Sequence, residues 1–249
     1  MEIIRSKSNQ RIKAAKKLQQ KKYRTKSYLI EGWHLVEEAI KAEVPIESIF
    51  IDEAYGDRLT DHPGRVLVSS DVIQYLADTP SPQGVIAQLS LQSAPLPQEL
   101  GGRYLVLDDV QDPGNVGTLI RTADAAGFQG VFLTEKTADL YNLKTLRSMQ
   151  GSHFHLPIYR MDKEELLAYL DQQDLPLYVS TLARDSVAYN ELSLPQSFVW
   201  VVGNEGAGVS QEMVEAANQL VHIPMPGRAE SLNVAVAGGI LLFYGLKNR

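Results

Sequence analysis

Residues 104–135, YLVLDDVQDPGNVGTLIRTADAAGFQGVFLTE, contain the pattern from which the fold class can be predicted. This stretch begins with an apolar run, 104–110, and ends with another, 130–135, each short enough to be a buried strand. Between them, residues 115–127 have the spacing of an amphipathic helix. A strand, a helix and a strand in this order predict parallel neighbours in a sheet that helices cover on both faces.

The same alternation continues along the chain and predicts an α/β fold with a mostly parallel sheet. Further apolar runs lie at 156–160, 177–182 and 197–202, and residues 163–173 have a helical pattern. The longest apolar run, 234–246, has thirteen residues, which is shorter than the roughly 20 that a membrane-spanning helix needs. We therefore predict a buried core helix there and no membrane partner.

A smaller α/β unit precedes this sheet. Its patterns are strand, helix and strand at 28–52, a strand and a helix at 65–79 with Ser69 or Ser70 as the N-cap, and a strand at 83–90. The segment 91–103 contains two prolines and two glycines without periodicity, which is typical of a linker. The predicted organisation is a small domain at 1–90, a linker at 91–103 and a larger domain at 104–249.

The composition excludes several chemistries. The chain has no cysteine, so disulfides, thiol catalysis and zinc–thiolate sites are excluded. The first residues lack an apolar signal segment, and we expect a cytoplasmic protein. His153 and His155 lie two positions apart near a predicted strand, but without further ligands they predict no metal site.

The charge of the chain is unevenly distributed. The net charge is −6, yet residues 1–26 contain ten lysines and arginines against the single acid Glu2. An acidic body with a basic arm is one layout for binding phosphate backbones locally. The alternative is a solvated helix, in which Ile12, Ala15 and Leu18 form a thin apolar stripe. The arm makes RNA or DNA a candidate partner.

Three loops follow strands at the carboxyl edge of the predicted sheet, where ligands of open α/β sheets bind. They are QDPGN at 111–115, GNEGAG at 203–208 and MPGRAESLN at 225–233. The glycines permit positive φ or close approach of the backbone to a ligand, and Ser210 is a candidate N-cap for the next helix. Neither the dinucleotide pattern G-x-G-x-x-G nor the phosphate pattern G-x-x-x-x-G-K-[ST] occurs in these loops. The residues alone therefore indicate a pocket for a small, mostly uncharged ligand.

In this order, the three motifs resemble those of the SpoU/TrmH-type RNA ribose 2′-O-methyltransferases of the SPOUT superfamily. The matching stretches are NVGTLIRTADAAGF, VVGNEGAGVS and IPMPGRAESLNVAVAGGILLFY, and LRSMQGSHFHLPI (146–158) is similar to the middle segment of that family. Residues 1–90 more loosely resemble its small RNA-binding domain. The resemblance implies a deep trefoil knot in the C-terminal domain, S-adenosylmethionine as methyl donor, and a homodimer through the knot helices. Gly238 and Gly239 fit a close approach of helices, either across the dimer or inside one chain.

The resemblance also implies the site residues. Gly203, Ile223 and Leu232 would surround the adenosine, with Thr181, Leu182 and Met225 as further cofactor-binding residues; plain core packing is the alternative for the apolar ones. Arg121 is the main catalytic candidate, either as a base or as a clamp for phosphate and ribose. The other catalytic candidates are Asn115, Glu205, Ser231 and Asn233.

Each of these four residues has an expected position. Asn115 opens a helix and contacts Arg121 or the ribose, or is only a cap. Glu205 orders Arg121 or a neighbouring stretch of backbone. We expect Ser231 to cap the last helix and Asn233 to project from its first turn.

The implied partner is RNA, with 23S rRNA favoured by the two-domain layout. The candidate RNA-binding residues are Arg5, Lys7, Arg11, Lys13 and Arg147. Two alternatives stay open: a non-catalytic RNA-binding or ribosome-associated protein on the same fold, and a tRNA 2′-O-methyltransferase. The sequence does not identify the methylated nucleotide.

Overall fold

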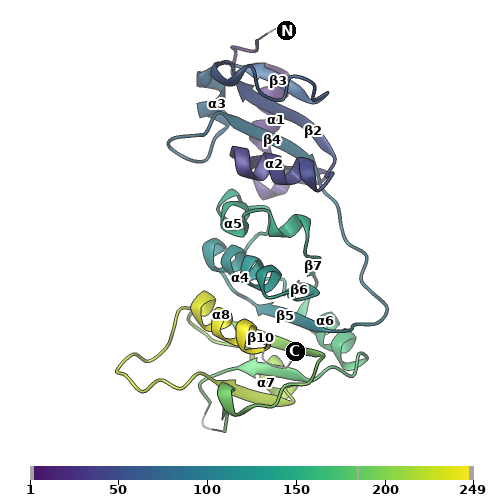
Figure 1. Ribbon diagram of the computed structural model, residues 1–249, viewed down its shortest axis with the longest axis vertical. Helices are drawn as coiled ribbons and strands as arrows, with labels where there is room; N and C mark the ends of the chain where they lie inside the picture. Colours follow the sequence, from purple (N-terminus) through teal and green to yellow (C-terminus); the bar gives the residue numbers. More distant parts are fainter. Residues whose placement is uncertain (1–2, 184, 247–249) are drawn as a thin grey trace. The chain divides into compact units, whose positions relative to one another are not determined.

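The computed structural model describes residues 3–183 and 185–246 and divides into two compact units (Figure 1). The first unit contains the residues up to Gln92 together with Asp139–Phe154, and the second contains Ser93–Ala138 together with the residues from His155 onward. The segment 139–154 therefore packs with the small N-terminal unit, although it lies in the middle of the predicted larger domain. The final residues 247–249 of that predicted domain lie outside the described residues.

The first unit is a four-stranded sheet in the order β1-β4-β2-β3, with β4 antiparallel to both of its neighbours. The strands are β1 (Ser27–Glu31), β2 (Ile46–Asp52), β3 (Arg65–Val68) and β4 (Val85–Ser90). The helices are α1 (Gln10–Lys17), α2 (Trp33–Lys41), α3 (Ser70–Leu76) and α5 (Leu143–Met149), with the 3₁₀ turns η1 (Lys21–Tyr23), η2 (Glu53–Tyr55) and η3 (Ser152–Phe154). The first unit therefore combines helices with a sheet, and its last strand, β4, ends at Ser90.

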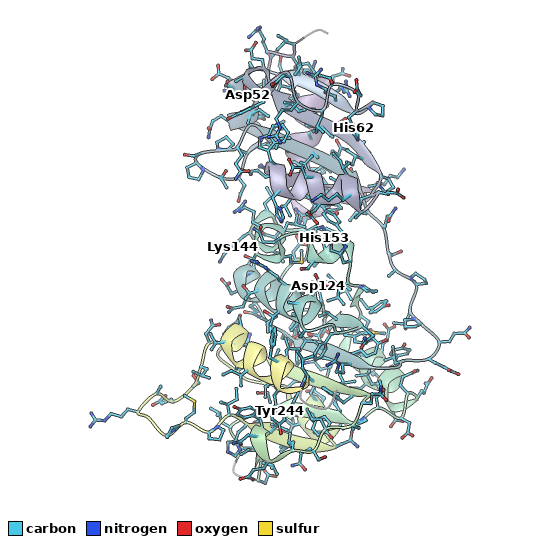
Figure 2. The ribbon with its side chains drawn as sticks, viewed as in Figure 1. Asp52, His62, Asp124, Lys144, His153 and Tyr244 are labelled. Atoms are coloured by element: carbon cyan, nitrogen blue, oxygen red, sulfur yellow. The ribbon has the colours of Figure 1, made fainter. Side chains whose placement is uncertain are left out.

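Charged and aromatic contacts hold the segment 139–154 within the first unit. Arg24, whose side chain is only 5% exposed, forms an ion pair with Asp139. The hydroxyl of Tyr28 lies 3.2 Å from Nε2 of His153, a residue labelled in Figure 2. Burial and the neighbouring Tyr141 raise the pKa of Tyr28 far above its usual range, so its hydroxyl stays protonated. Arg24, one of the ten basic residues of the arm, thus has a structural role.

The second unit is a seven-stranded sheet in the order β7-β6-β5-β10-β8-β11-β9, and every pairing in it is parallel. The strands are β5 (Arg103–Asp108), β6 (Gly130–Leu133), β7 (Ile158–Arg160), β8 (Leu177–Ser180), β9 (Val187–Ala188), β10 (Phe198–Gly203) and β11 (Gln219–His222). The helices are α4 (Pro113–Ala125), α6 (Lys163–Asp171), α7 (Gln211–Glu215) and α8 (Val234–Tyr244), with a 3₁₀ turn η4 (Tyr189–Glu191). The predicted parallel α/β sheet is confirmed.

Alternate residues of the central strands divide the core between the two faces of this sheet. Val199 and Val201 of β10 pack in one cluster with residues of α6 and α7. On the other face, a Cβ at Gly238 of α8 would overlap the side chain of Leu119 in α4 and lie 4.0 Å from Val202 of β10. Helices therefore cover both faces, as predicted, and α4 and α8 lie side by side (Figure 1).

The helix α8 is only partly buried. Ala235, Leu241 and Leu242 are buried, but Val236 is 53% exposed and Phe243 is 50% exposed. The prediction of a fully buried helix is therefore wrong within the single chain. One face of the helix packs on α4 and β10, and the other face is also apolar but lacks a covering element among the described residues.

Candidate active site

The carboxyl ends of β8, β10 and β11 surround a pocket of about 610 Å³ in the second unit. These strands are parallel neighbours, so their ends and the loops that follow meet at one edge of the sheet. The lining comes from Ser180–Ala183, Val202–Val209, Ile223, Met225, Ser231–Val234 and Ala237. Figure 1 shows the segment between β11 and α8 as a long open loop at this edge.

All six residues that the resemblance implied for the cofactor lie in this lining: Gly203, Ile223, Leu232, Thr181, Leu182 and Met225. Leu182 is 66% exposed and Leu232 is 36% exposed, so core packing does not explain their apolar side chains. The sequence interpretation missed Ser180, Ala183, Val209, Val234 and Ala237, which also line the pocket. Their positions next to strand ends and at the start of α8 are the signal that could have identified them.

The glycine loop after β10 closes on itself. The main chains of Asn204 and Gly208 exchange two hydrogen bonds of 2.9 and 3.0 Å. A Cβ at Gly203 would overlap the main-chain nitrogen of Val209, and Gly208 has a φ of +75°. Gly206 is different, because a Cβ there would lie 3.7 Å from Asn204 Oδ1 and its φ is not positive. Two of the three glycines are thus required by the fold of the loop itself.

Glu205 extends from this loop to the loop that follows β5. Its carboxylate accepts hydrogen bonds from the amides of Gln111 (3.1 Å) and Asp112 (3.0 Å) and from Nδ2 of Asn115 (2.9 Å). Burial alone would raise the pKa of Glu205, but these hydrogen bonds hold it below its usual value. Of the two predicted contacts of Glu205, the backbone is therefore the one observed, and Arg121 is not among its partners.

Asn115 links Glu205 to the start of α8. Its Nδ2 donates to Glu205, and its Oδ1 accepts from Nδ2 of Asn233 at 3.1 Å. The alternative in which Asn115 only caps α4 is wrong, and so is its position as the opening residue, because the helix begins at Pro113 and the side chain of Asp112 caps it. Proline at the first position of the helix places the cap one residue before it.

Asn233, rather than Ser231, caps α8. Its Oδ1 accepts from the amides of Ala235 (2.9 Å) and Val236 (3.4 Å). Ser231 is exposed in the loop before the helix and makes no hydrogen bond among the described residues, so its predicted capping role is wrong. The helix starts at Val234, two residues too late for Ser231 to reach its first amides.

Arg121 lies on the exposed side of α4 and does not line the pocket. It makes no hydrogen bond or ion pair within residues 3–183 and 185–246, so its predicted contact with Asn115 is not formed. Six residues of an α-helix turn through about 600°, which places Arg121 on a different side of α4 from Asn115.

A largely buried ion pair, Asp108–Lys163, contacts the segment that follows the glycine loop, and the sequence did not predict it. Oδ2 of Asp108, at the end of β5, accepts from the amide of Ser210 at 2.7 Å, and Lys163 lies 3.0 Å from Oδ1. Burial alone would lower the pKa of Lys163, but Asp108 and Asp109 raise it above its usual value. Ser210 is the N-cap residue of α7, as predicted, although its side chain makes no capping hydrogen bond. Two consecutive acids at the end of a buried strand were the available signal.

The candidate RNA-binding residues all lie in the first unit, and several have protein partners. Both guanidinium Nη atoms of Arg5 donate to Glu53 at 2.7 Å. Arg11 donates to Ser48 at 3.3 Å, and Arg147 donates to Asp78 at 2.9 Å. The ammonium groups of Lys7 and Lys13 have no ion pair within the described part of the chain.

Two further features bear on the kind of site. Among the described residues, no group of three or more histidine or acidic side chains is arranged to hold a metal ion. In the same residues, no helix is long and apolar enough to cross a membrane.

Comparisons with known proteins agree with this geometry. The family model described as the SpoU rRNA Methylase family matches residues 102–243, and an MRM3-like substrate binding domain matches residues 9–87. The chain is 41% identical over 248 residues to the 23S rRNA (guanosine(2553)-2′-O)-methyltransferase RlmP of Bacillus subtilis, covering 98% of this chain and 99% of the relative. It is 33% identical over 255 residues to an uncharacterized tRNA/rRNA methyltransferase of Synechocystis, covering 96% and 92%. A solved structure of an AdoMet-bound rRNA methyltransferase from Sinorhizobium meliloti superposes with a TM-score of 0.89 at 33% identity, over 99% of this chain and 98% of that one.

Proposed function

The chain belongs to the SpoU rRNA methylase family, and we propose that it transfers a methyl group from S-adenosylmethionine to a ribose 2′-hydroxyl of 23S rRNA. The observation that carries the proposal is the pocket of about 610 Å³ built from the ends of three parallel strands, with all six implied cofactor residues in its lining. An rRNA substrate also implies that the enzyme works in the cytoplasm.

The residues of the pocket fit a purine nucleoside with an amino-acid tail. Its volume lies within the range of about 300–1,000 Å³ typical of small-molecule sites. Ile223, Leu232 and Met225 offer apolar surface for an adenine ring, and the glycine loop offers main-chain groups without side chains. When bound, the sulfonium of the donor supplies an activated methyl group. We assign Gly203, Ile223 and Leu232 to the adenosine and Thr181, Leu182 and Met225 to the rest of the donor.

The acceptor side is assigned to Arg121 and Ser231. A guanidinium remains protonated at neutral pH, so Arg121 acts as a clamp for phosphate and ribose rather than as a base. Its exposed position on α4, without a protein partner among the described residues, leaves its donors open to RNA. Ser231 lines the pocket and is exposed, so its hydroxyl is open to the acceptor ribose.

Asn115, Glu205 and Asn233 form the support of this site. Because Glu205 accepts only through oxygen, Asn115 must turn its Nδ2 toward it and its Oδ1 toward Asn233. Asn233 then presents Oδ1 to the first amides of α8. The three side chains thereby fix the three loops relative to one another, and alignment of reacting groups is worth several kcal/mol in a displacement of this kind.

The similarity to the Bacillus subtilis relative suggests which nucleotide is the acceptor. That protein is named for guanosine 2553 of 23S rRNA, and the match extends over nearly the whole of both chains. We assign the counterpart of this nucleotide as the acceptor here. A tRNA acceptor is the alternative, and the full-length match to an rRNA enzyme favours 23S rRNA over it.

We propose two features of the fold on the same basis, a trefoil knot in the second unit and a homodimer. The open face of α8, with Val236 and Phe243, is an apolar stripe suited to a second copy. A Cβ at Gly239 would lie 3.9 Å from Thr122, so this glycine is not required by packing within the chain. Gly238 is required by packing within the chain, because of its contact with Leu119.

Calorimetric titration with S-adenosylmethionine tests the enzyme assignment. We expect binding at micromolar strength that is lost in Gly203→Ala, because the added methyl group overlaps the loop, and retained in the matched control Gly206→Ala. Melting of both variants checks that the sheet remains folded. If neither the wild type nor the wild type with RNA binds the donor, the non-catalytic RNA-binding alternative replaces this proposal.

A further inference from the structure

Two tyrosine rings in the first unit each lie beside two lysine ammonium groups. Nζ of Lys7 is 6.0 Å and Nζ of Lys16 is 5.1 Å from the ring centre of Tyr75. Nζ of Lys17 is 5.6 Å and Nζ of Lys22 is 5.0 Å from the ring centre of Tyr23. These six residues are called the tyrosine–lysine face.

The local structure explains how the two rings come to flank one helix. Ile12 and Ala15 bury one side of α1, which leaves the lysines on the other. Lys16 and Lys17 are consecutive, so their side chains leave the helix about 100° apart and meet different rings. Tyr75 comes from α3, and Tyr23 comes from η1 just after α1.

The four ammonium groups belong to a chain that carries a net charge of −6. None of them forms an ion pair within residues 3–183 and 185–246. Glu31 and Asp78, the carboxylates that act on Lys16, are already engaged. Glu31 accepts from the amide of Asp78 and from the hydroxyl of Thr79, and Asp78 accepts from Arg147.

Two positive ammonium groups lie near each tyrosine ring, and the ring face, rather than a carboxylate in an ion pair, stabilises them. A cation over an aromatic ring gains only about 0.5–1 kcal/mol at an exposed site. Two ammonium groups at each ring therefore favour an external anion. Tyr23 is 41% exposed, so part of its surface is open to a flat partner.

We propose that the tyrosine–lysine face binds unpaired nucleotides of the rRNA substrate, with the lysines on phosphates and the tyrosines stacked on bases. The inference rests on the proposed function, which supplies the RNA. Aromatic rings next to a positive surface are the combination that holds single strands, because stacking needs a base whose face is not already covered. An acidic protein would use the lysines but would leave the rings without a role.

Fluorescence anisotropy of the full-length protein with a 23S rRNA transcript spanning guanosine 2553, measured over a range of salt concentrations, tests this inference. Two double variants remove the lysines of each ring, K7Q/K16Q and K17Q/K22Q. In each of them, the magnitude of the negative slope of log K against log salt should decrease by about 1.4–1.8. Tyr23→Leu and Tyr75→Leu should weaken binding roughly 5- to 100-fold with the slope unchanged. Lys41→Gln is the control, because Lys41 is exposed but pairs with Glu38.

Three outcomes overturn the inference. Unchanged slopes and affinities in variants that still bind S-adenosylmethionine would mean that RNA contacts the protein elsewhere, while the proposed function stands. An equal loss in the tyrosine variants for a fully double-stranded RNA would contradict stacking. A wild type that neither binds nor methylates the transcript would remove the proposed function together with this inference.

Discussion

Oε1 of Glu205 accepts a hydrogen bond of 2.9 Å from Nδ2 of Asn115, and this contact joins the loop that follows β10 to the first turn of α4, which comes after the neighbouring strand β5. The same carboxylate accepts two main-chain amides at the start of α4. A carboxylate at the N-terminus of a helix is stabilised by the helix dipole as well as by these hydrogen bonds. The contact therefore fixes both the spacing of the loops and the direction in which the amide of Asn115 points.

Replacing Glu205 by glutamine should destabilise the protein by about 1 kcal/mol at pH 7. Hydrogen bonds to a charged group contribute about 1.5–3 kcal/mol each, and the exposure of this side chain reduces that figure. The amide nitrogen of Gln would also face one of the three donors. Urea unfolding of both proteins at pH 7 measures the difference, and an unchanged midpoint would contradict the anchoring role.

The difference in unfolding free energy between the wild type and Glu205→Gln should decrease at acid pH. The pKa of Glu205 in the folded protein lies below the ordinary value of about 4.3, so its stabilisation is fully present above that value. It is lost as the pH falls through the folded pKa, because the protonated carboxyl no longer accepts as an anion. Unfolding measured between pH 7 and pH 3 should show the gap to Glu205→Gln narrowing below about pH 4.3. A constant gap would point to a contribution independent of charge.

The substitution Asn233→Asp distinguishes two roles of Asn233, the capping of α8 and the hydrogen bond to Asn115. An aspartate still accepts the amides of Ala235 and Val236, but it no longer donates to Oδ1 of Asn115. The free energy of unfolding should stay within about 0.5 kcal/mol of the wild type, since Asp and Asn cap equally well. Turnover at saturating donor should fall at least about tenfold, because misalignment at a reacting centre has effects of that size. Unchanged turnover would assign Asn233 to capping alone.

The substitution Ser231→Ala tests whether the neighbouring Ser231 contacts the substrate. Ser231 is exposed and makes no capping hydrogen bond to any described residue, so its loss should leave stability unchanged within about 0.5 kcal/mol. A fall in turnover then reports contact with the substrate. Retained turnover together with retained stability would remove Ser231 from the acceptor site.

Arg121→Lys should lower turnover at least about tenfold while calorimetric affinity for S-adenosylmethionine stays unchanged. Lysine keeps the charge but lacks the planar fork that binds a phosphate through two hydrogen bonds. Arg121 lies outside the pocket lining, which is why donor binding should be unaffected. Near-full turnover of the lysine variant would contradict the clamp.

Charges on the open face of α8 should dissociate the proposed dimer. Val236→Asp or Phe243→Asp would bury a carboxylate against apolar surface, and sedimentation should show a shift from dimer to monomer. Leu96→Asp is the control, because Leu96 is a similarly exposed apolar residue outside α8. A wild type that sediments as a monomer, or variants that remain dimers, would place the interface elsewhere or remove it.

The apolar runs and the glycine positions were sufficient to predict the parallel sheet and the edge at which the pocket lies. The capping residue of α8 was not predictable from composition, because Ser231 and Asn233 are both good caps and the choice depends on where the loop enters the helix. The sequence also could not predict which face of α8 is open. A helix that is apolar on all sides has no amphipathic pattern that would identify its buried face.

Ion pairs between residues far apart in the sequence could not be predicted either. Arg5 pairs with Glu53, 48 residues away, and Arg24 pairs with Asp139, 115 residues away. Neither partner has a local pattern that would identify it, so the sequence predicts RNA binding for Arg5 and no particular role for Arg24. The ion pair of Lys163 with Asp108 was not predictable for the same reason.

The most direct measurement is methylation of an unmodified 23S rRNA transcript by the purified protein with S-adenosylmethionine, followed by nuclease digestion and mass spectrometry of the fragments. We expect one added methyl group on the ribose of the guanosine equivalent to 2553, which is absent when donor is omitted and much reduced with Arg121→Lys. A methyl group on a base, or no methylation by a protein that binds the donor and the RNA, would contradict it.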